Sequence, residues 1–425
     1  MTGQEAINYI HACHWQSHAP GLSRMRALLR ALGEPQQGLK FVHVAGTNGK
    51  GSTCAMIASV LESAGYRVGL NTSPYLVTFH ERIQVNGRMI SDGELAELTE
   101  RVRPAAEAMA EHPTEFELIT AIALLYFKER ACDIVVLEVG LGGALDASNV
   151  IAVPEAAVIT AMGMDHMAQL GSTLGEIAAA KAGIIKPGGA VVSYGGCPEA
   201  DEVIRRACRR QGAWLYEADF SRLEPLSLEL GGAVFRCAPY GTLRLPLAGT
   251  YQLKNALVAV TAAEVLRQAG WHLESRHIRQ GLAVVRWPGR FEVLRPADPV
   301  FLLDGAHNAH GIAAAAESLR VLLPGRKVTL LLGVLADKNV EPMLSGIAPL
   351  AERVFTVTPD SPRAMDAKEL ARRLLPWGVP VRACSSVEEG AGAAVAAAGA
   401  GGAVCALGSL YLSAAVRRAV ESRKT

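Results

Sequence analysis

The sequence predicts an α/β protein of two domains. The first is expected to be a P-loop-type, mostly parallel sheet flanked by helices, with a small antiparallel addition, and the second a smaller Rossmann-like α/β domain. Short β-branched apolar runs alternate with longer helical patterns, as in βαβ units whose strands are buried on both faces. The length of 425 residues exceeds what one domain normally holds. Prolines and charges in RWPGRFEVLRPADP interrupt the alternation and predict a boundary there.

The first half predicts parallel strands at FVHVAG, VGLNTS, DIVVLEVG, AAVITAM and AVVSYG. Helices are expected from about Ser52 to Ala64 and from about Phe116 to Arg130, where the apolar spacing is helical. The segment from Trp214 to Leu247 contains LSLEL, GGAVFRCA and GTLRLPL, which are short alternating runs separated by Gly and Pro. This segment is therefore expected to be the antiparallel addition. A helix from about Tyr251 to Ala269 follows.

The second half starts a new alternating series, so the domains are predicted at 1–294 and 295–425. Its expected strands are FLLDGAH, KVTLLLGVL, VFTVTP, VRACSS and AVCALGS. The alanine-rich stretch 391–402 is expected to be a helix end and a loop, because a strand follows it at once.

Composition excludes several functional classes. The 42 basic and 41 acidic side chains leave a formal charge of +1, which argues against a dedicated nucleic-acid binder. The 8 cysteines include no CxxC pair and are expected to be reduced, as in the cytoplasm. The N-terminal stretch shows no signal-peptide pattern and no apolar run is long enough to span a bilayer. A cytoplasmic monomer that binds small molecules, without nucleic-acid or membrane partners, is therefore expected.

The strongest motif is VHVAGTNGKGST at 42–53, in which an apolar strand leads through a glycine-rich turn into a helix. Glycines 46, 49 and 51 let backbone N–H groups face an anion, and Lys50 adds a mobile cation, so the motif predicts a phosphate cradle. A tight turn with an incidental lysine is the alternative. The pattern GxxxxGK[ST] is not met, because Gly51 follows the lysine, so a protein that used MgATP here would need its metal ligand from elsewhere.

Further motifs follow in order along the chain. They are SPYLVTFHERIQVNG, EVGLGGALDASN, MDHMAQLGSTLGEIAAAKAGIIKPG, GTYQLKNA, RWPGRFE, LDGAHNAHG and GSLYL. Together with GTNGKGST, these motifs resemble the folylpolyglutamate synthase and dihydrofolate synthase family within the Mur ligase group. The resemblance covers most of the chain. It implies an ATP-dependent amide ligase in which ATP phosphorylates a carboxylate, an amino-acid amine attacks the acyl phosphate, and ADP and phosphate leave.

The resemblance also implies roles for individual residues. ATP is expected to contact Gly46, Thr47, Asn48, Gly49, Lys50, Gly51, Ser52, Thr53, Gln252, Asn255, Arg290, Asp304 and His307. Lys50, Lys181 and His307 are expected to be catalytic, and Arg290 to hold phosphate oxygens across the domain boundary, for which a planar guanidinium is suited. As single residues, Arg290 is equally consistent with an interdomain ion pair and Asp304 with a helix cap.

Two magnesium ions are implied, with Ser73, Glu138 and His166 as ligands. Ser73 would replace the hydroxyl missing after Lys50, although a serine before proline is also an ordinary turn residue. Glu138 ends an apolar strand, at the edge where open α/β sheets bind ligands. Lys181 lies among small apolar residues and is expected to be carbamylated. Its alternative is a lysine that extends outward to solvent.

The substrates implied are L-glutamate with dihydropteroate or a reduced folate. The pteroate site is expected to comprise Leu22, Arg24, Thr114, Phe116, Leu145, Asp146 and Ala147. Phe116 would stack on a flat heterocycle and Asp146 would accept hydrogen bonds from its amino-pyrimidine ring, whereas a core phenylalanine and a loop cap are the alternatives.

This chain departs from the family pattern at three positions. Tyr75 and Tyr251 stand where the family often has His, and Ala144 stands where many members have Arg or Asp. These changes leave the acceptor preference open. Folylpolyglutamate synthase activity alone, a Mur-type ligase acting on a cell-wall nucleotide peptide, and a P-loop protein that hydrolyses ATP without ligation remain alternatives. The leading interpretation is an enzyme that adds L-glutamate both to dihydropteroate and to folates, and the first alternative lacks only the dihydrofolate synthase activity.

Overall fold

The computed structural model describes residues 1–13 and 21–422, and their contacts divide the chain into two compact units. The first unit comprises Met1–Gly163, Met167–Ser221 and Asn255–Val285. The second comprises Met164–His166, Arg222–Lys254 and Arg286–Thr425. Each unit is therefore assembled from segments that are separated in the sequence.

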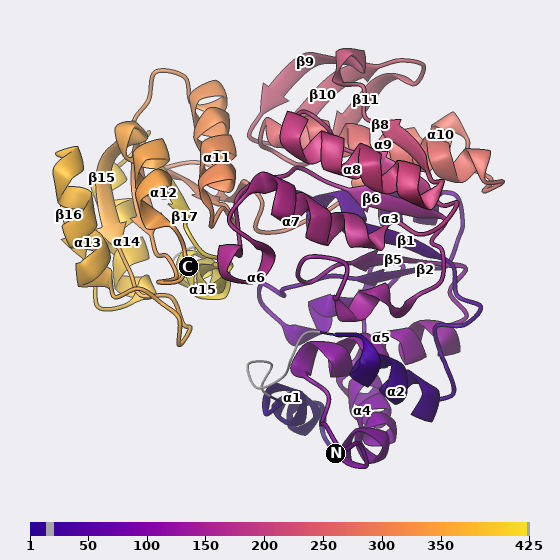
Figure 1. Ribbon diagram of the computed structural model, residues 1–425. Coiled ribbons are helices and arrows are strands. Elements are labelled where there is room, and N and C mark those ends of the chain that lie inside the picture. Colours follow the sequence, from indigo (N-terminus) through magenta and orange to yellow (C-terminus); the bar gives the residue numbers. More distant parts are fainter. Residues whose placement is uncertain (14–20, 423–425) are drawn as a thin grey trace. The chain divides into compact units, whose positions relative to one another are not determined.

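Eight strands of the described chain form one sheet in the first unit (Figure 1). They are β1 (Phe41–Ala45), β2 (Val68–Asn71), β3 (Ile83–Val85), β4 (Arg88–Met89), β5 (Ile134–Glu138), β6 (Ala156–Ile159), β7 (Ala190–Ser193) and β8 (Trp214–Glu217). Their order is β4-β3-β2-β5-β1-β6-β7-β8, and every neighbouring pair from β2 to β8 is parallel. Strands β1, β2, β5 and β6 are buried throughout, as strands covered on both faces must be.

Helices cover both faces of this sheet. They are α1 (Gly3–His11), α2 (Ser23–Ala31), α3 (Lys50–Ser63), α4 (Asp92–Glu107), α5 (Glu115–Glu129), α6 (Met167–Leu170), α7 (Leu174–Lys181), α8 (Pro198–Gln211), most of α9 (Tyr251–Gln268) and α10 (Ser275–Val284). In Figure 1, helices α1, α2, α4 and α5 lie together on one face of the sheet. They share one hydrophobic cluster with side chains of β1 and β5. A second cluster joins α8 to β1, β6 and β7. Helices α4, α5 and α7 each begin at a capping box, which satisfies N–H groups that the first turn leaves unpaired.

The second unit holds a six-stranded sheet among its described residues, with the order β12-β13-β17-β14-β15-β16. Its strands are β12 (Glu292–Arg295), β13 (Val300–Leu303), β14 (Val328–Leu332), β15 (Ala351–Thr356), β16 (Val381–Ala383) and β17 (Ala403–Leu407). Its helices are α11 (Ala309–Leu322), α12 (Val340–Ile347), α13 (Ala367–Leu374), α14 (Val387–Ala398) and α15 (Ser413–Glu421). One cluster contains core residues of α11, α12 and α13, and another those of α14 and α15, so helices pack on both faces.

A small antiparallel sheet also belongs to the second unit. It is formed by β9 (Leu223–Glu229), β10 (Gly232–Cys237) and β11 (Gly241–Leu245), in the order β11-β10-β9. Gly232 has a φ of +128°, and an added Cβ would lie 2.3 Å from the Leu245 carbonyl oxygen, so the start of β10 requires a glycine. The predicted antiparallel strands are therefore present, but they belong to the second unit, whereas the sequence predicted them as an addition to the first domain.

The predicted α/β class is confirmed, with two corrections to individual elements. The predicted antiparallel segment began at Trp214, but β8 pairs in parallel with β7 and closes the large sheet. The sequence pattern misled because β8 is a partly exposed edge strand, so its residues do not form a continuous apolar run. Strand β12 was missed because it lies within the proline-rich interruption, and it pairs antiparallel with β13. The predicted domain division at 294/295 falls inside β12, and as a statement about domains it stays a prediction.

Candidate active site

The glycine-rich loop connects β1 to α3 and cannot carry side chains at two positions. A Cβ on Gly46, which has a φ of +149°, would lie 1.9 Å from the Thr160 hydroxyl oxygen. A Cβ on Gly49, which has a φ of +85°, would lie 2.5 Å from the Asn255 side-chain oxygen. Gly49 is also the N-cap of α3, whose first turn presents backbone N–H groups and partial positive charge. The loop is thus shaped as an anion-binding turn.

Two lysine ammonium groups converge on this loop. The Lys50 Nζ donates to the Gly46 and Thr47 carbonyl oxygens, each at 3.3 Å. The Lys181 Nζ, at the last residue of α7, donates to the same Gly46 carbonyl at 2.8 Å, and the side chain is buried. Two like charges that share one neutral acceptor repel each other, so the site favours an added negative charge. Lys181 does not extend to solvent, which corrects that alternative.

Ser73 and Glu138 are adjacent because they follow neighbouring parallel strands. Asn71 of β2 pairs with Leu137 of β5, and the Ser73 N–H donates to the Glu138 carboxylate at 2.9 Å. Glu138 is buried. A serine hydroxyl and a carboxylate are hard oxygen donors, and Mg²⁺ is usually held by one or two carboxylates with waters and substrate phosphates. The pair fits Mg²⁺, although no group of three or more His, Cys, Asp or Glu side chains suited to a metal exists among residues 1–13 and 21–422.

Within the second unit, Asp165 is surrounded by cationic and amide groups. Lys338 forms an ion pair with its Oδ1, the Asn308 Nδ2 donates to Oδ2 at 2.9 Å, and the His307 Nε2 lies 3.5 Å from Oδ2. Burial raises the pKa of Asp165, but the hydrogen bond from His307 and the charges of His307, His166 and Lys338 outweigh it and hold the pKa well below its usual range. Asp165 is therefore an anion that fixes the segment before His166.

His166 itself has a φ of +51° and is partly exposed. Its backbone N–H donates to the Asp165 Oδ1 at 2.9 Å, which fixes this unusual backbone conformation. The Asp165 carboxylate thus fixes the backbone of His166, the predicted metal ligand. Asn308 and Lys338 were not singled out from the sequence, although Asn308 directly follows His307 in LDGAHN.

Asp304 has its carboxylate oxygens engaged by neighbouring loops. Its Oδ1 accepts from the Ala306 N–H at 2.8 Å, and its Oδ2 accepts from the Phe291 N–H at 2.8 Å and from the Tyr251 hydroxyl at 2.7 Å. The Arg290 guanidinium rests against Gly305, where a Cβ would lie 1.9 Å from its Nη1. Asp304 therefore holds the loops that carry Arg290 and the other predicted residues of LDGAHN.

On α9, both predicted nucleotide contacts are buried. Gln252 is 0% exposed and Asn255 is 3% exposed. Asn255 belongs to the first unit and abuts Gly49, as described above, whereas Gln252 belongs to the second unit. The structure therefore places Asn255 beside the glycine-rich loop.

Five of the predicted pteroate residues lie at the start of α5 or in the loop after β5, and the other two, Leu22 and Arg24, lie at the start of α2. The Arg24 Nε lies 3.2 Å from the Glu117 carboxylate, which also accepts from the Thr114 N–H at 2.8 Å. Glu117 was missed by the sequence analysis, and its place three residues after Thr114 in a capping box was the available signal. The Phe116 ring is half-buried over Gly140, where a Cβ would lie 2.6 Å from its Cζ. Leu22 is the N-cap residue of α2.

Asp146 caps a short 3₁₀ helix (Ala147–Val150) and holds the loop before it. Its oxygens accept from the Leu141 N–H at 2.8 Å and from the backbone and hydroxyl of Ser148. Burial raises the pKa of Asp146, against the lowering effect of these hydrogen bonds. The predicted loop cap is thus present, and Ala147 is buried while Leu145 is 57% exposed.

His43 beneath this loop predicts a pH dependence of stability. Its Nε2 lies 2.8 Å from the Ser148 hydroxyl, and burial, followed by the charge of Lys186, lowers its pKa from 6.5 to about 3. Between these values the unfolded chain binds a proton that the folded chain does not. The free energy of unfolding therefore decreases as pH falls, by up to about 1.4 kcal/mol per pH unit from this residue.

Urea unfolding at neutral and at mildly acidic pH measures this effect. His43→Gln is expected to reduce the pH slope by about one proton relative to the wild type. An unchanged slope would show that His43 is not the group responsible.

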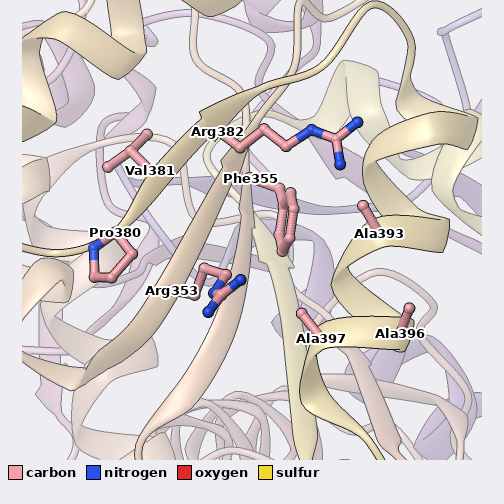
Figure 2. Close-up of a pocket in the computed structure, with 8 residues that line it drawn as sticks. All are labelled: Arg353, Phe355, Pro380, Val381, Arg382, Ala393, Ala396 and Ala397. Atoms are coloured by element: carbon pink, nitrogen blue, oxygen red, sulfur yellow. The ribbon is translucent and has the colours of Figure 1, made fainter.

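Two surface cavities lie apart from the predicted residues. One of about 400 Å³ lies between β15, β16 and α14, lined by Arg353, Phe355, Pro380, Val381, Arg382, Ala393, Ala396 and Ala397 (Figure 2). The other, of about 650 Å³, is lined by residues of the end of α9, of the turn that follows and of the start of α10, including Trp271 and Arg276. Neither includes a residue predicted from the motifs. The candidate active site is therefore defined by the glycine-rich loop and the charged side chains described above, and not by either of these cavities.

Comparison with known proteins agrees with this reading. Residues 44–263 match the Mur ligase middle domain, and residues 289–410 match the Mur ligase, glutamate ligase domain. The dihydrofolate synthase/folylpolyglutamate synthase of Bacillus subtilis (strain 168) is 40% identical over 385 residues, 86% of this chain and 87% of the relative. The protein of the same name from Escherichia coli (strain K12) is 31% identical over 426 residues, 99% of this chain and 96% of the relative.

Solved structures are similar over nearly the whole chain. Mycobacterium tuberculosis folylpolyglutamate synthase complexed with ADP has a TM-score of 0.90 at 30% identity, covering 98% of both chains. E. coli FolC in complex with DHPP and ADP has a TM-score of 0.88 at 30% identity, covering 100% of this chain and 99% of that chain.

The fold, the glycine-rich loop with its two lysines and the matched domains define a ligase of the Mur ligase group, a class of ATP-dependent amide ligases. Among the described residues, no helix is both long and apolar enough to cross a membrane. Within that group, the chain belongs to the folylpolyglutamate synthase/dihydrofolate synthase family.

Proposed function

We propose that the enzyme joins L-glutamate to dihydropteroate and adds further glutamates to reduced folates, each time through an acyl phosphate formed from ATP. The observation that carries the proposal is the convergence of Lys50 and Lys181 on the Gly46 carbonyl, in a loop at the start of α3. The names of the Bacillus subtilis and E. coli relatives, which give both activities, support the choice of substrates.

In the proposed reaction, the loop N–H groups and Lys50 hold the β- and γ-phosphates. Phosphoryl transfer to a carboxylate brings anions together, so fixed donors and cations stabilise the charge that develops. Ser73 and Glu138 would hold Mg²⁺, which when bound neutralises charge on the phosphate oxygens. The Ser73 N–H already orients the Glu138 carboxylate, so the pair is preorganised for this task.

We further propose that Lys181 is carbamylated in the active enzyme. An ammonium group beside Lys50 repels it, whereas a neutral amine can react with CO2. The carbamate would carry a negative charge and oxygens suited to Mg²⁺ or its waters. The buried position of Lys181 and its 2.8 Å bond to Gly46 support this proposal, because burial disfavours a lone charge there.

Residues of the second unit are proposed to complete ATP binding. Arg290 would hold phosphate oxygens, and Gln252 and His307 would contact the nucleotide. His166 is proposed as a further Mg²⁺ ligand. Asp304 is assigned a supporting part, since its oxygens accept three hydrogen bonds from Ala306, Phe291 and Tyr251.

The dihydropteroate is proposed to bind against Phe116 and Asp146. The half-buried Phe116 ring can stack on the pterin, and the Asp146 carboxylate can accept from an amino-pyrimidine donor. Its Oδ2, which accepts from the Leu141 N–H, is the proposed acceptor, because Oδ1 already accepts two hydrogen bonds from Ser148. The enzyme is proposed to act as a cytoplasmic monomer on these small molecules.

Glutamate-dependent release of ADP from the purified enzyme tests the function. Turnover is expected with dihydropteroate and with tetrahydrofolate. Turnover with tetrahydrofolate but not with dihydropteroate would show that the enzyme is a folylpolyglutamate synthase without dihydrofolate synthase activity. Turnover with a UDP-linked muramyl peptide would favour a cell-wall ligase, and ADP release that does not depend on glutamate would favour a hydrolytic P-loop protein.

A further inference from the structure

We propose that the Tyr251 hydroxyl is a positioning group for ATP binding, because it ties the start of α9 to the two loops that carry Arg290 and His307. The inference rests on the proposed function and adds a residue that does not itself touch the nucleotide. The hydrogen bonds from which it is argued lie within the second unit.

The anchor of this arrangement is one carboxylate oxygen. The Asp304 Oδ2 accepts from the Tyr251 hydroxyl at 2.7 Å and from the Phe291 N–H at 2.8 Å, which joins chain positions 251, 291 and 304 at one atom. Asp304 is 3% exposed, so water does not compete freely for this oxygen. Hydrogen bonds to a charged acceptor are stronger than those between neutral groups. The hydroxyl is therefore a structural tie between segments that are far apart in sequence.

The loop that carries Arg290 has a backbone conformation that needs such a tie. Phe291 has a φ of +50°, which is unfavourable for a bulky side chain, and its ring is buried. The Gly305 N–H donates to the Gly289 carbonyl at 2.9 Å and completes a second link between the two loops. Arg290 lies between these links and rests on Gly305. The Phe291 N–H and the Tyr251 hydroxyl donate to the same Asp304 oxygen. Without the Tyr251 bond, this oxygen would be less well fixed as the acceptor of the Phe291 N–H.

The bond between Tyr251 and Asp304 also lies close in sequence to two residues that are proposed to contact the nucleotide. Gln252 follows Tyr251 at the start of α9, and His307 follows Asp304 by three residues in the loop before α11. Tyr251 thus connects three elements that are proposed to contact one ligand. Burial, and then the charge of Asp304, raises the pKa of Tyr251 well above its usual range, so the hydroxyl remains a donor.

The Tyr251 ring is also fixed in place. A Cβ on Gly249, which has a φ of +99°, would lie 2.9 Å from the Tyr251 Cε1, and the ring packs on the core of the second unit. Removing only the hydroxyl should leave this packing intact. The bond can therefore be tested without a large change of shape.

Steady-state kinetics of Tyr251→Phe test the inference, with ATP, dihydropteroate and L-glutamate each varied in turn. The KM for ATP is expected to rise about tenfold, and the KM values for the other two substrates to stay within about twofold. Tyr251→His, whose imidazole N–H can donate to Asp304, is expected to recover part of the ATP affinity. Tyr126→Phe is the matched control, since it removes the hydroxyl of a buried tyrosine that bonds Glu94 at 3.4 Å in the first unit.

An unchanged KM for ATP in Tyr251→Phe would overturn the inference. So would a parallel loss of affinity for all three substrates together with a lower melting temperature, because that pattern indicates a structural role alone. Wild-type turnover with dihydropteroate and glutamate tests the proposed function separately. If turnover is absent, equilibrium binding of ATP to the wild type and to Tyr251→Phe still decides the role of the hydroxyl.

Discussion

Replacing Lys50 by alanine is expected to lower kcat by more than tenfold and to leave the fold intact. The ammonium group bonds only carbonyl oxygens of its own loop among the contacts described, so its loss exposes no core residue. In the proposed reaction the same group faces the outer phosphates of ATP, where it stabilises charge in the transition state more than in the ground state. A tenfold loss corresponds to about 1.4 kcal/mol.

Glutamate-dependent ADP release and thermal unfolding, measured side by side, check this expectation. Lys40→Ala is the matched control, because Lys40 precedes β1, is 60% exposed and pairs with Glu155 at 2.9 Å. The control should keep wild-type activity. If Lys50→Ala retains more than about a tenth of wild-type kcat, the assigned phosphate role is wrong.

Replacing Lys181 by alanine is expected to abolish activity, and a small added carboxylic acid is expected to restore part of it. The acid would place carboxylate oxygens where the carbamate stood. The native protein should carry the mass of one CO2 on Lys181, detectable by mass spectrometry under conditions that preserve carbamates.

Lys186→Ala provides the comparison for this experiment. Lys186 lies five residues after Lys181 and its Nζ donates to the Asn149 carbonyl at 3.0 Å, outside the glycine-rich loop. The activity of Lys186→Ala should not change when a small carboxylic acid is added. An unmodified Lys181 in a fully active, ATP-bound enzyme would rule out the carbamate.

The parts of the fold that the sequence predicted are those set by local patterns. Strand β1 is a continuous apolar run because both of its faces are buried, and α5 was predicted because its apolar residues recur at helical spacing. The capping box of Thr114 and Glu117 at the start of α5 was not used in that prediction. Strand β8 escaped correct assignment because an exposed edge strand has no such run. Strand β12 escaped because prolines on both sides suggested an irregular linker.

In the candidate site, too, features set by local sequence were predicted and features set by distant contacts were not. The glycine-rich loop was predicted because Gly46, Gly49 and Gly51 lie close together around one lysine, between an apolar strand and a helix. The close approach of Thr160 to Gly46, by contrast, comes from a distant part of the chain. The bond between Tyr251 and Asp304 joins residues 53 positions apart, and that between Lys338 and Asp165 joins residues 173 apart. Pairings of this kind depend on the tertiary fold, and no spacing rule along the chain encodes them.

The way the chain alternates between its two units bears on its biosynthesis. Apart from Met164–His166, which belong to the second unit, it leaves the first unit at Arg222, returns at Asn255 and leaves again at Arg286. Helix α10 belongs to the first unit, where the Gly281 carbonyl accepts a 2.7 Å bond from the Ser59 hydroxyl of α3 and Gly281 abuts Val60. On the ribosome, this part of α3 therefore stays uncovered until α10 has been translated. For the same reason, no single proteolytic cut can release either unit whole.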